Sequence, residues 1–335
     1  MKVLACHLRD FDADTLIFLR QLGIKHVQFN TPTLPGEKTW SYSVLRNFKE
    51  KVESYGVDLV CIENVPIKFY DKVMLGLPGR DEQIDNYIKI IRNLGKLGIS
   101  LFGYHFVPTF VWRTSFNAKT NNGARVSEFV LQDANTSENK IIYPARTDIE
   151  IPDEQTMWDN HLYFLEAILP EAKKSNVFLS LHPDDPPIPM VANVHRLFYK
   201  FENFKRFNDL INHPNWGLDL CLGCCSEMNG SESVHQFIEY FGPLGKIFYV
   251  HFRDVVGVIP DFKECFLGEG NFNPSKVLRH LRQVGFDGYI TVDHTPIVQG
   301  DTQWGHRSRA FEMGKLQGML DMMTYDDENT TLISK

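Results

Sequence analysis

Short apolar runs alternate with amphipathic stretches along most of the chain. The apolar runs span five to seven residues each, a length typical of buried parallel strands. Eight runs are predicted as strands: Lys2–Cys6, Lys25–Phe29, Val57–Glu63, Ser100–Phe106, Val177–His182, Trp216–Cys221, Ile247–His251 and Tyr289–Asp293. The stretches between them carry apolar residues at helical spacing, as Ile84, Ile88 and Ile91 illustrate. These predicted helices are Asp14–Leu22, Tyr42–Tyr55, Asp81–Leu97, Asp153–Ser175, Ala192–Leu210, Glu232–Phe241, Pro274–Val284 and Gly305–Met323.

Eight strands alternating with eight helices predict an α/β protein, specifically a (β/α)8 TIM barrel. A doubly wound sheet would carry a glycine-rich fingerprint after its first strand, and the sequence has none there. Two segments interrupt the alternation. Residues 107–151, after strand four, are long, polar and turn-rich, which favours a lid or substrate cap over a disordered loop. Residues 325–335 are polar without periodicity and are expected to form a flexible tail, so residues 1–324 form one catalytic barrel domain.

Composition and charge narrow the class of protein. The net charge is −7, and the 35 lysines and arginines are scattered, which argues against a nucleic-acid partner. No apolar stretch approaches the 18 or so residues of a membrane span. The six cysteines do not resemble a disulfide framework, and they point to a reducing compartment, the cytoplasm. Cys221 and Cys224 have CxxC spacing, but no second pair follows at zinc-finger distance.

Four predicted strands end in residues that can bind a metal ion. They are His182, Cys221, His251 and Asp293. In a parallel barrel the carboxyl ends of the strands converge on one face, where the chemistry takes place. Two imidazoles, a thiolate and a carboxylate are suitable ligands for a divalent cation. Taken singly, these residues can have structural roles instead. A histidine can be a hydrogen-bonded core residue, and Cys221 can be a small buried apolar residue. Cys224 or Cys225 could also be the metal ligand in place of Cys221.

Several longer motifs resemble those of the D-mannonate dehydratase family, within the xylose-isomerase-like barrel superfamily. From the third strand to the eighth they occur in family order: residues 62–66 (IENVP), 75–81 (LGLPGRD), 91–99 (IRNLGKLGI), 108–114 (PTFVWRT), 181–187 (LHPDDPP), 220–223 (LCLG), 250–255 (VHFRDV) and 293–294 (DH). The resemblance implies a hydro-lyase that converts D-mannonate to 2-keto-3-deoxy-D-gluconate in hexuronate (glucuronate) catabolism. It also implies His182, Cys221, His251 and Asp293 as ligands of Mn²⁺, and His294 as an acid or base.

The sequence departs from the family pattern in three places. The family's Asp-His-Gly reads Asp293-His294-Thr295 here, and the tryptophan segment around Trp112 is shorter. The family tyrosine before the last helix is missing, and His306 is the candidate to replace it. Residues 266–272 (FLGEGNF) resemble the sugar isomerases and epimerases of the superfamily.

Dehydration next to a carboxylate needs three groups. A cation must stabilise the enediolate formed when C2 loses its proton, a base must take that proton, and an acid must protonate the departing C3 hydroxyl. Imidazoles suit both proton transfers, so His294 and His306 are the catalytic candidates. Mn²⁺ is the expected metal, although a thiolate ligand would also suit Fe²⁺, Co²⁺ or Zn²⁺.

The substrate-binding candidates come from the same predicted face and the predicted lid. Arg80 or Arg113 could grip the substrate carboxylate by a bidentate contact. The other candidates are Glu63, Asn64, His105, Trp112 and Asp184. Most of them have a structural alternative: a turn cap for Asp184, turn chemistry for Glu63 and Asn64, an ion pair with Asp81 for Arg80, and core packing for His105 and Trp112.

The expected partner is therefore a small sugar acid, and the expected assembly is a homodimer. Two other functions stay open at this point. One is a metal-dependent sugar isomerase or epimerase, which would exchange an aldose and a ketose without loss of water. The other is a non-catalytic sugar-acid binder that would be stabilised by its ligand without turnover.

Overall fold

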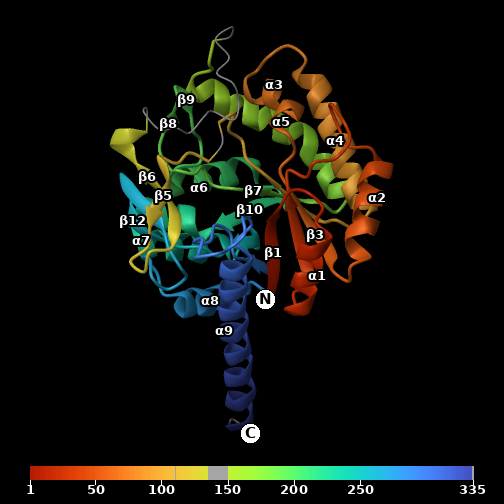
Figure 1. Cartoon of the computed structure of the whole chain (residues 1–335). Coiled ribbons are helices and arrows are strands. Elements are labelled where there is room, and N and C mark those ends of the chain that lie inside the picture. Colours follow the sequence, from red (N-terminus) through yellow and green to blue (C-terminus); the bar gives the residue numbers. More distant parts are fainter. Residues whose placement is uncertain (110, 135–149, 334–335) are drawn as a thin grey trace.

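Eight parallel strands close into a barrel in the order β1-β14-β11-β10-β7-β4-β3-β2 (Figure 1). The computed structural model describes residues 1–109, 111–134 and 150–333. The barrel strands are β1 (Lys2–Leu8), β2 (His26–Asn30), β3 (Asp58–Glu63), β4 (Leu101–Tyr104), β7 (Phe178–Leu181), β10 (Trp216–Cys221), β11 (Ile247–His251) and β14 (Tyr289–Thr291). All eight coincide with the predicted strands to within a few residues at each end, and the predicted (β/α)8 barrel is confirmed.

Helices follow the strands and cover the outside of the barrel (Figure 1). They are α1 (Ala13–Gln21), α2 (Tyr42–Glu53), α3 (Asp71–Met74), α4 (Arg80–Lys96), α5 (Glu154–Lys174), α6 (Phe201–Ile211), α7 (Leu222–Phe241), α8 (Pro274–Gln283) and α9 (His306–Ile333). Side chains cap several first turns: Ser41 accepts from Val44 N, and Asp153 accepts from Thr156 N. Such caps satisfy backbone N–H groups that have no partner within the helix.

Two helix predictions were wrong about where the helix begins. The helix expected from residue 192 begins only at Phe201, because Ala192 and Asn193 have positive φ angles of 51° and 63° and turn the chain between β8 (Met190–Val191) and β9 (Val194–His195). Helix α7 begins at Leu222, ten residues before the predicted start. It is interrupted at Asn229 and Gly230, whose backbone angles are not helical. The predicted helix corresponds to the part after this interruption.

A second, antiparallel sheet has the strand order β12-β13-β6-β5 and is called the cover sheet below. Strands β5 (Ser115–Lys119) and β6 (Arg125–Val130) come from the segment predicted as a lid. Strands β12 (Val255–Val258) and β13 (Asp261–Glu264) directly follow barrel strand β11. The pairing of Phe262 with Phe129 joins the two parts. Residues 110 and 135–149 of the predicted lid lie outside the described residues.

The C-terminal segment continues the last helix. Helix α9 projects from the body of the barrel (Figure 1) and runs to Ile333, ten residues beyond its predicted end. Residues 325–333, expected to form a flexible tail, are therefore helical, and 334–335 lie outside the described residues. Among the helices described, none combines the length and the apolar character needed to cross a membrane.

Gly103 in β4 tests how tightly the barrel is packed beneath the site. A Cβ at this position would lie 2.7 Å from Glu63 Cγ and closer still to Tyr249 Oη, and both side chains are buried. Gly103→Ala is expected to lower the free energy of unfolding by about 1–3 kcal/mol through overpacking. The measurement is urea denaturation.

The matched control is Gly314→Ala on the exposed side of α9, where a Cβ would meet nothing within 4 Å. It should leave stability unchanged or raise it by up to about 1 kcal/mol, because alanine favours a helix over glycine. Equal effects of the two substitutions would contradict the tight packing inferred around Gly103.

Candidate active site

Four side chains that are far apart in sequence meet at the carboxyl ends of the barrel strands. His182, Cys221, His251 and Asp293 each offer one ligand atom, and these atoms all lie within 4.8 Å of one another. All four residues are buried. Atoms that share one transition-metal ion at about 2.0–2.3 Å lie at most about 4.6 Å apart. The geometry therefore comes close to that of a single cation site, at the face where the sequence placed these four residues.

The polar atoms of this ligand cluster fit a cation. His182 Nδ1 lies 2.6 Å from the carbonyl oxygen of Pro183, an arrangement in which Nδ1 donates and Nε2 stays available as a ligand. Among the described residues neither ring nitrogen of His251 makes a hydrogen bond, nor does either carboxylate oxygen of Asp219. Buried polar atoms that make no hydrogen bond are costly, even where an oppositely charged group lies nearby. A cation among them would remove that cost.

The cluster is rich in negative charge. His251 Nε2 lies 3.2 Å from both Glu63 Oε2 and Asp219 Oδ2, and Nδ1 lies 3.6 Å from Asp293 Oδ1. Glu63, Asp219 and His251 thus form a second group that could hold a metal ion, sharing His251 with the first. Burial raises the pKa of Glu63, but the adjacent imidazoles, His251 foremost, outweigh burial and lower the pKa to about 2.

The surroundings of the Cys221 thiol also favour metal binding. Burial raises its pKa, but the hydrogen bond from Cys224 and the positive charges of Arg253 and His182 lower the pKa well below its usual value. Because the thiolate, and not the thiol, binds metals, this environment favours the binding form.

Arg253 connects the ligand cluster to a buried network of ion pairs. Its Nε donates to Asp293 Oδ2 at 2.8 Å, and Nη2 donates to Asp185 Oδ2 at 2.7 Å. Nη1 donates to Glu227 Oε1 at 2.8 Å and to Glu264 Oε1 at 3.1 Å. Every group in this network is buried. Arg253 therefore fixes the orientation of one candidate ligand relative to three other carboxylates.

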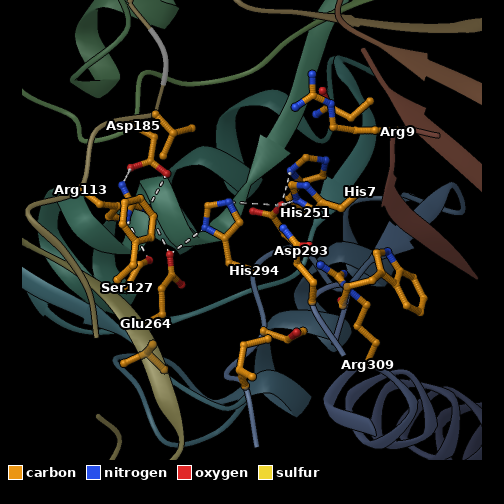
Figure 2. Close-up of a pocket in the computed structure, with 18 of the residues that line it drawn as sticks. His7, Arg9, Arg113, Ser127, Asp185, His251, Glu264, Asp293, His294 and Arg309 are labelled. Carbon is orange, nitrogen blue, oxygen red and sulfur yellow. Dashed lines mark hydrogen bonds and ion pairs between the residues drawn. The ribbon is translucent and has the colours of Figure 1, made fainter. Parts of the chain in front are cut away.

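His294 lies between this network and the cluster (Figure 2). Its Nδ1 is 2.8 Å from Glu264 Oε1, on β13 of the cover sheet, and its Nε2 is 3.9 Å from Asp293 Oδ1. The side chain of His294 is 27% exposed, whereas that of Glu264 is 2% exposed. A buried carboxylate that holds one ring nitrogen while the other faces the cavity is an arrangement suited to proton transfer.

A pocket of about 480 Å³ opens beside these groups, between the strand ends and the cover sheet. This volume is in the range of small-molecule sites. The barrel contributes His7, Glu63, His182, His251, Asp293 and His294 to its lining, and the cover sheet contributes Arg125, Val126, Ser127 and Glu264. The pocket therefore gives a small ligand access to the cluster.

Comparison with known proteins shows which family has this arrangement. The sequence profile of the family described as D-mannonate dehydratase (UxuA) matches residues 2–150 and 143–330. The chain belongs to the D-mannonate dehydratase family. The mannonate dehydratase of Thermotoga maritima is 29% identical over 336 residues, covering 89% of this chain and 88% of the relative. That of Lactococcus lactis subsp. cremoris is 27% identical over 333 residues, covering 90% and 92%.

Solved structures agree with this family assignment. The crystal structure of mannonate dehydratase from Streptococcus suis serotype 2 matches with a TM-score of 0.85 and 26% identity, covering 95% of this chain and 93% of the other. A D-tagatose 3-epimerase-like protein matches with a TM-score of 0.61 at 15% identity, covering 97% and 99%, and shows the common barrel fold alone. As a member of the D-mannonate dehydratase family, the chain is an enzyme of the hydro-lyase class.

Some of the predicted substrate-binding residues lie in the pocket of this dehydratase-family site. Glu63, His105 and Arg113 line it. Asn64 is not among the lining residues, and its side-chain oxygen accepts from His105 N at 3.1 Å. Arg113 is 1% exposed and bonds through both terminal nitrogens to Asp185. It is thus occupied by an internal carboxylate.

Besides Asn64 and the candidate ligand Cys221, four predicted site residues are absent from the pocket lining: Arg80, Trp112, Asp184 and His306. Arg80 begins α4 and lies 4.2 Å from the Tyr163 ring. Trp112 packs inside the apolar cluster under the cover sheet. Asp184 accepts from Phe198 N at 2.6 Å, a structural contact with a residue fourteen positions away rather than the turn cap weighed for it.

His306 is the fourth of these residues. Its Nε2 lies 3.1 Å from Thr15 Oγ1 and its Nδ1 lies 2.6 Å from Thr302 Oγ1. Because both ring nitrogens contact threonine hydroxyls away from the pocket, its position does not support the acid or base role predicted for it.

The sequence reasoning missed several groups that contact the site. His7 follows the apolar core of β1, has a positive φ of 59°, and contacts Asp293 through Nε2. The same strand-end pattern that identified His182 could have identified His7. Glu264 gave no comparable signal, because it reaches the site through an antiparallel sheet whose partner strand lies more than a hundred residues away. Arg253 appeared only within the motif at residues 250–255, which gave no indication of its buried ion-pair network.

Removal of Arg253 tests the buried network. Arg253→Gln is expected to lower the free energy of unfolding of the metal-free enzyme by about 3–5 kcal/mol, because it leaves buried carboxylates without their counter-charge. Chemical denaturation at neutral pH measures the change.

Lys38→Gln, which breaks the exposed Lys38–Glu82 pair, is the control and should have little effect. A loss of stability no greater than that of the control would show that Arg253 does not carry the network.

Proposed function

We propose that this enzyme removes water from D-mannonate to give 2-keto-3-deoxy-D-gluconate, as one step of hexuronate catabolism, with a divalent cation bound by His182, Cys221, His251 and Asp293. The observation that carries the proposal is the meeting of these four side chains in one cluster, in a chain of the D-mannonate dehydratase family. Mn²⁺ is the proposed metal, with Fe²⁺, Co²⁺ and Zn²⁺ as the alternatives that the thiolate admits. The cytoplasmic location and the dimeric assembly stay predictions.

The reaction removes the proton from C2 and the hydroxyl group from C3 of the sugar acid. The hydroxyl leaves with a proton as water, and the resulting enol rearranges to the 2-keto acid. When bound, the cation supplies the positive charge that stabilises the negative charge developing on the substrate carboxylate. The ligands and Arg253 hold that position, since Arg253 fixes Asp293.

His294 is the proposed proton-transfer group. Glu264 orients its Nδ1, and the exposed part of the ring faces the pocket beside Asp293. His7 offers a second imidazole, with its ring centroid 5.4 Å from that of His294. Proton transfer by a positioned histidine contributes typically about 10²–10⁴-fold to a rate.

The direct test is turnover of D-mannonate by the purified protein after loading with Mn²⁺. Formation of a 2-keto-3-deoxy acid, lost on chelation and restored by Mn²⁺, is the expected result. Conversion of the sugar acid without loss of water would favour the isomerase or epimerase alternative. Binding without conversion, at saturating metal, would leave the non-catalytic binder.

Replacement of the thiolate ligand tests the metal site itself. Cys221→Ala is expected to weaken Mn²⁺ binding by more than the 10–100-fold or so caused by changes around metal ligands, because it removes a direct bond. Metal content after dialysis against graded chelator measures this.

Cys225→Ala is the matched control, since Cys225 is buried in the apolar core outside the candidate ligand groups of the described residues. Equal metal content in the two variants would exclude Cys221 as a ligand.

The two candidate catalytic histidines give opposite expectations. His294→Asn should lower kcat by about 10²–10⁴-fold while metal content is kept, because the proton-transfer group is lost. His306→Asn should change kcat by less than about threefold, because its ring contacts Thr15 and Thr302 away from the pocket. Steady-state kinetics on both variants decide the assignment. A larger loss for His306→Asn would reverse it.

A further inference from the structure

We propose that Arg9 is the residue that binds the carboxylate of the sugar-acid substrate. This inference rests on the proposed function and identifies the side chain that makes the site selective for acids. Arg9 follows β1 and lines the pocket. Figure 2 shows it beside His7, at the opposite side of the drawn pocket from Arg113 and Asp185. Neither the sequence motifs nor the strand-end pattern pointed to this residue.

A carboxylate entering this pocket needs a cation that is not already neutralised. The pocket lining includes the carboxylates of Glu63, Asp185, Glu264 and Asp293, which repel an anion. The lining also includes four arginines: Arg9, Arg113, Arg125 and Arg309. A guanidinium is the side chain best matched to a carboxylate, because it donates two parallel hydrogen bonds. The substrate-binding arginine can thus be sought among these four by what each already contacts.

Two of the four are committed to other groups. Arg113 is 1% exposed, and its terminal nitrogens donate to Asp185 and Glu264. Arg309 is 6% exposed, and it donates to Trp304 O at 2.7 Å and to Val292 O at 2.8 Å. Their guanidiniums hold the protein together, and a ligand would have to displace internal partners to reach them.

Arg125 is partly committed. It lies at the start of β6 in the cover sheet, and its Nη1 donates to Phe116 O at 3.4 Å. Because that contact is long and the side chain is exposed, Arg125 is the rival candidate for the same role.

Arg9 has the strongest case. Among the described residues its guanidinium makes no hydrogen bond or ion pair, although its backbone oxygen is held by Thr33 N at 3.3 Å. Arg9 is only two residues from His7, which contacts the candidate ligand Asp293. The backbone of this cation is therefore anchored next to the ligand cluster, while its donors stay available to a substrate.

The test compares binding of D-mannonate and of the neutral analogue D-mannitol to the Mn²⁺-loaded protein. Isothermal titration calorimetry gives Kd, and steady-state kinetics gives KM and kcat. Arg9→Gln is expected to weaken D-mannonate binding and raise KM by about 10–100-fold, the range of a charged hydrogen bond. D-mannitol binding should not change. Arg9→Lys should recover part of the loss, since lysine keeps the charge without the bidentate contact.

Two further variants complete the design. Arg46→Gln, on the exposed face of α2, is the neutral control. Arg125→Gln tests the rival, and a larger effect on Kd from Arg125→Gln than from Arg9→Gln would overturn the proposal. Thermal melting and metal content, unchanged in Arg9→Gln, would show that the variant is folded and loaded.

The outcomes separate this inference from the proposed function. If the wild-type protein converts D-mannonate and Arg9→Gln keeps KM and Kd within twofold, the Arg9 assignment is overturned and the dehydratase proposal stands. If the wild-type protein binds D-mannonate through Arg9 but does not convert it, the proposed function fails and the assignment stands. Failure of the wild-type protein to bind D-mannonate would overturn both.

Discussion

The guanidinium of Arg253 is the point where the barrel, the cover sheet and the ligand cluster meet. It donates to Asp293 in the cluster, to Asp185 after β7, and to Glu264 of the cover sheet. Glu264 in turn holds His294. The placement of a candidate metal ligand and of the candidate proton-transfer group therefore depends on one buried cation. The guanidinium is planar and presents five N–H donors in fixed directions. Arg253 therefore sets the orientation of the carboxylates that it binds as well as balancing their charge.

Charge balance explains why this part of the barrel is suited to a metal ion. Burial raises the pKa of a carboxylate unless a positive group compensates it. Asp185 is compensated, because Arg113 and Arg253 outweigh burial and hold its pKa below the usual value. Around His251 the compensation is incomplete: burial and the neighbouring Glu63 raise the pKa of Asp219 well above its usual value. A divalent cation between His182, Cys221, His251 and Asp293 would supply the missing positive charge.

Local pattern predicted the barrel and the cluster well for a physical reason. Buried parallel strands appear as short apolar runs, and the residue at the end of each run falls on the active face. This rule and the family motifs were sufficient to predict that residues 182, 221, 251 and 293 come together. His306 and Trp112 do not line the pocket, because their positions depend on tertiary packing that the local pattern does not specify. The local sequence does not indicate that His306 contacts Thr15. Nor does it indicate that Trp112 packs in the apolar cluster of the cover sheet.

The cover sheet marks the limit of local reasoning. Its strands β6 and β13 pair across more than a hundred residues, and neither reads as a strong strand alone. The position of Glu264 beside His294, which it orients, could therefore not be predicted from the sequence. Arg9 and His7 lie beyond the predicted end of the first strand, at Cys6, although β1 runs on to Leu8. A boundary error of two residues was enough to miss His7, and Arg9 lies one residue beyond the observed end of β1.

Anomalous diffraction from crystals of the Mn²⁺-loaded protein tests the central claim most directly. The account predicts one strong manganese peak bonded to side-chain atoms of His182, Cys221, His251 and Asp293. A peak held instead by Glu63 and Asp219 would contradict it, as would a peak held by Asp185, Cys224 and Glu227, a further group whose ligand atoms lie close together. The absence of manganese from all of these groups would also contradict it.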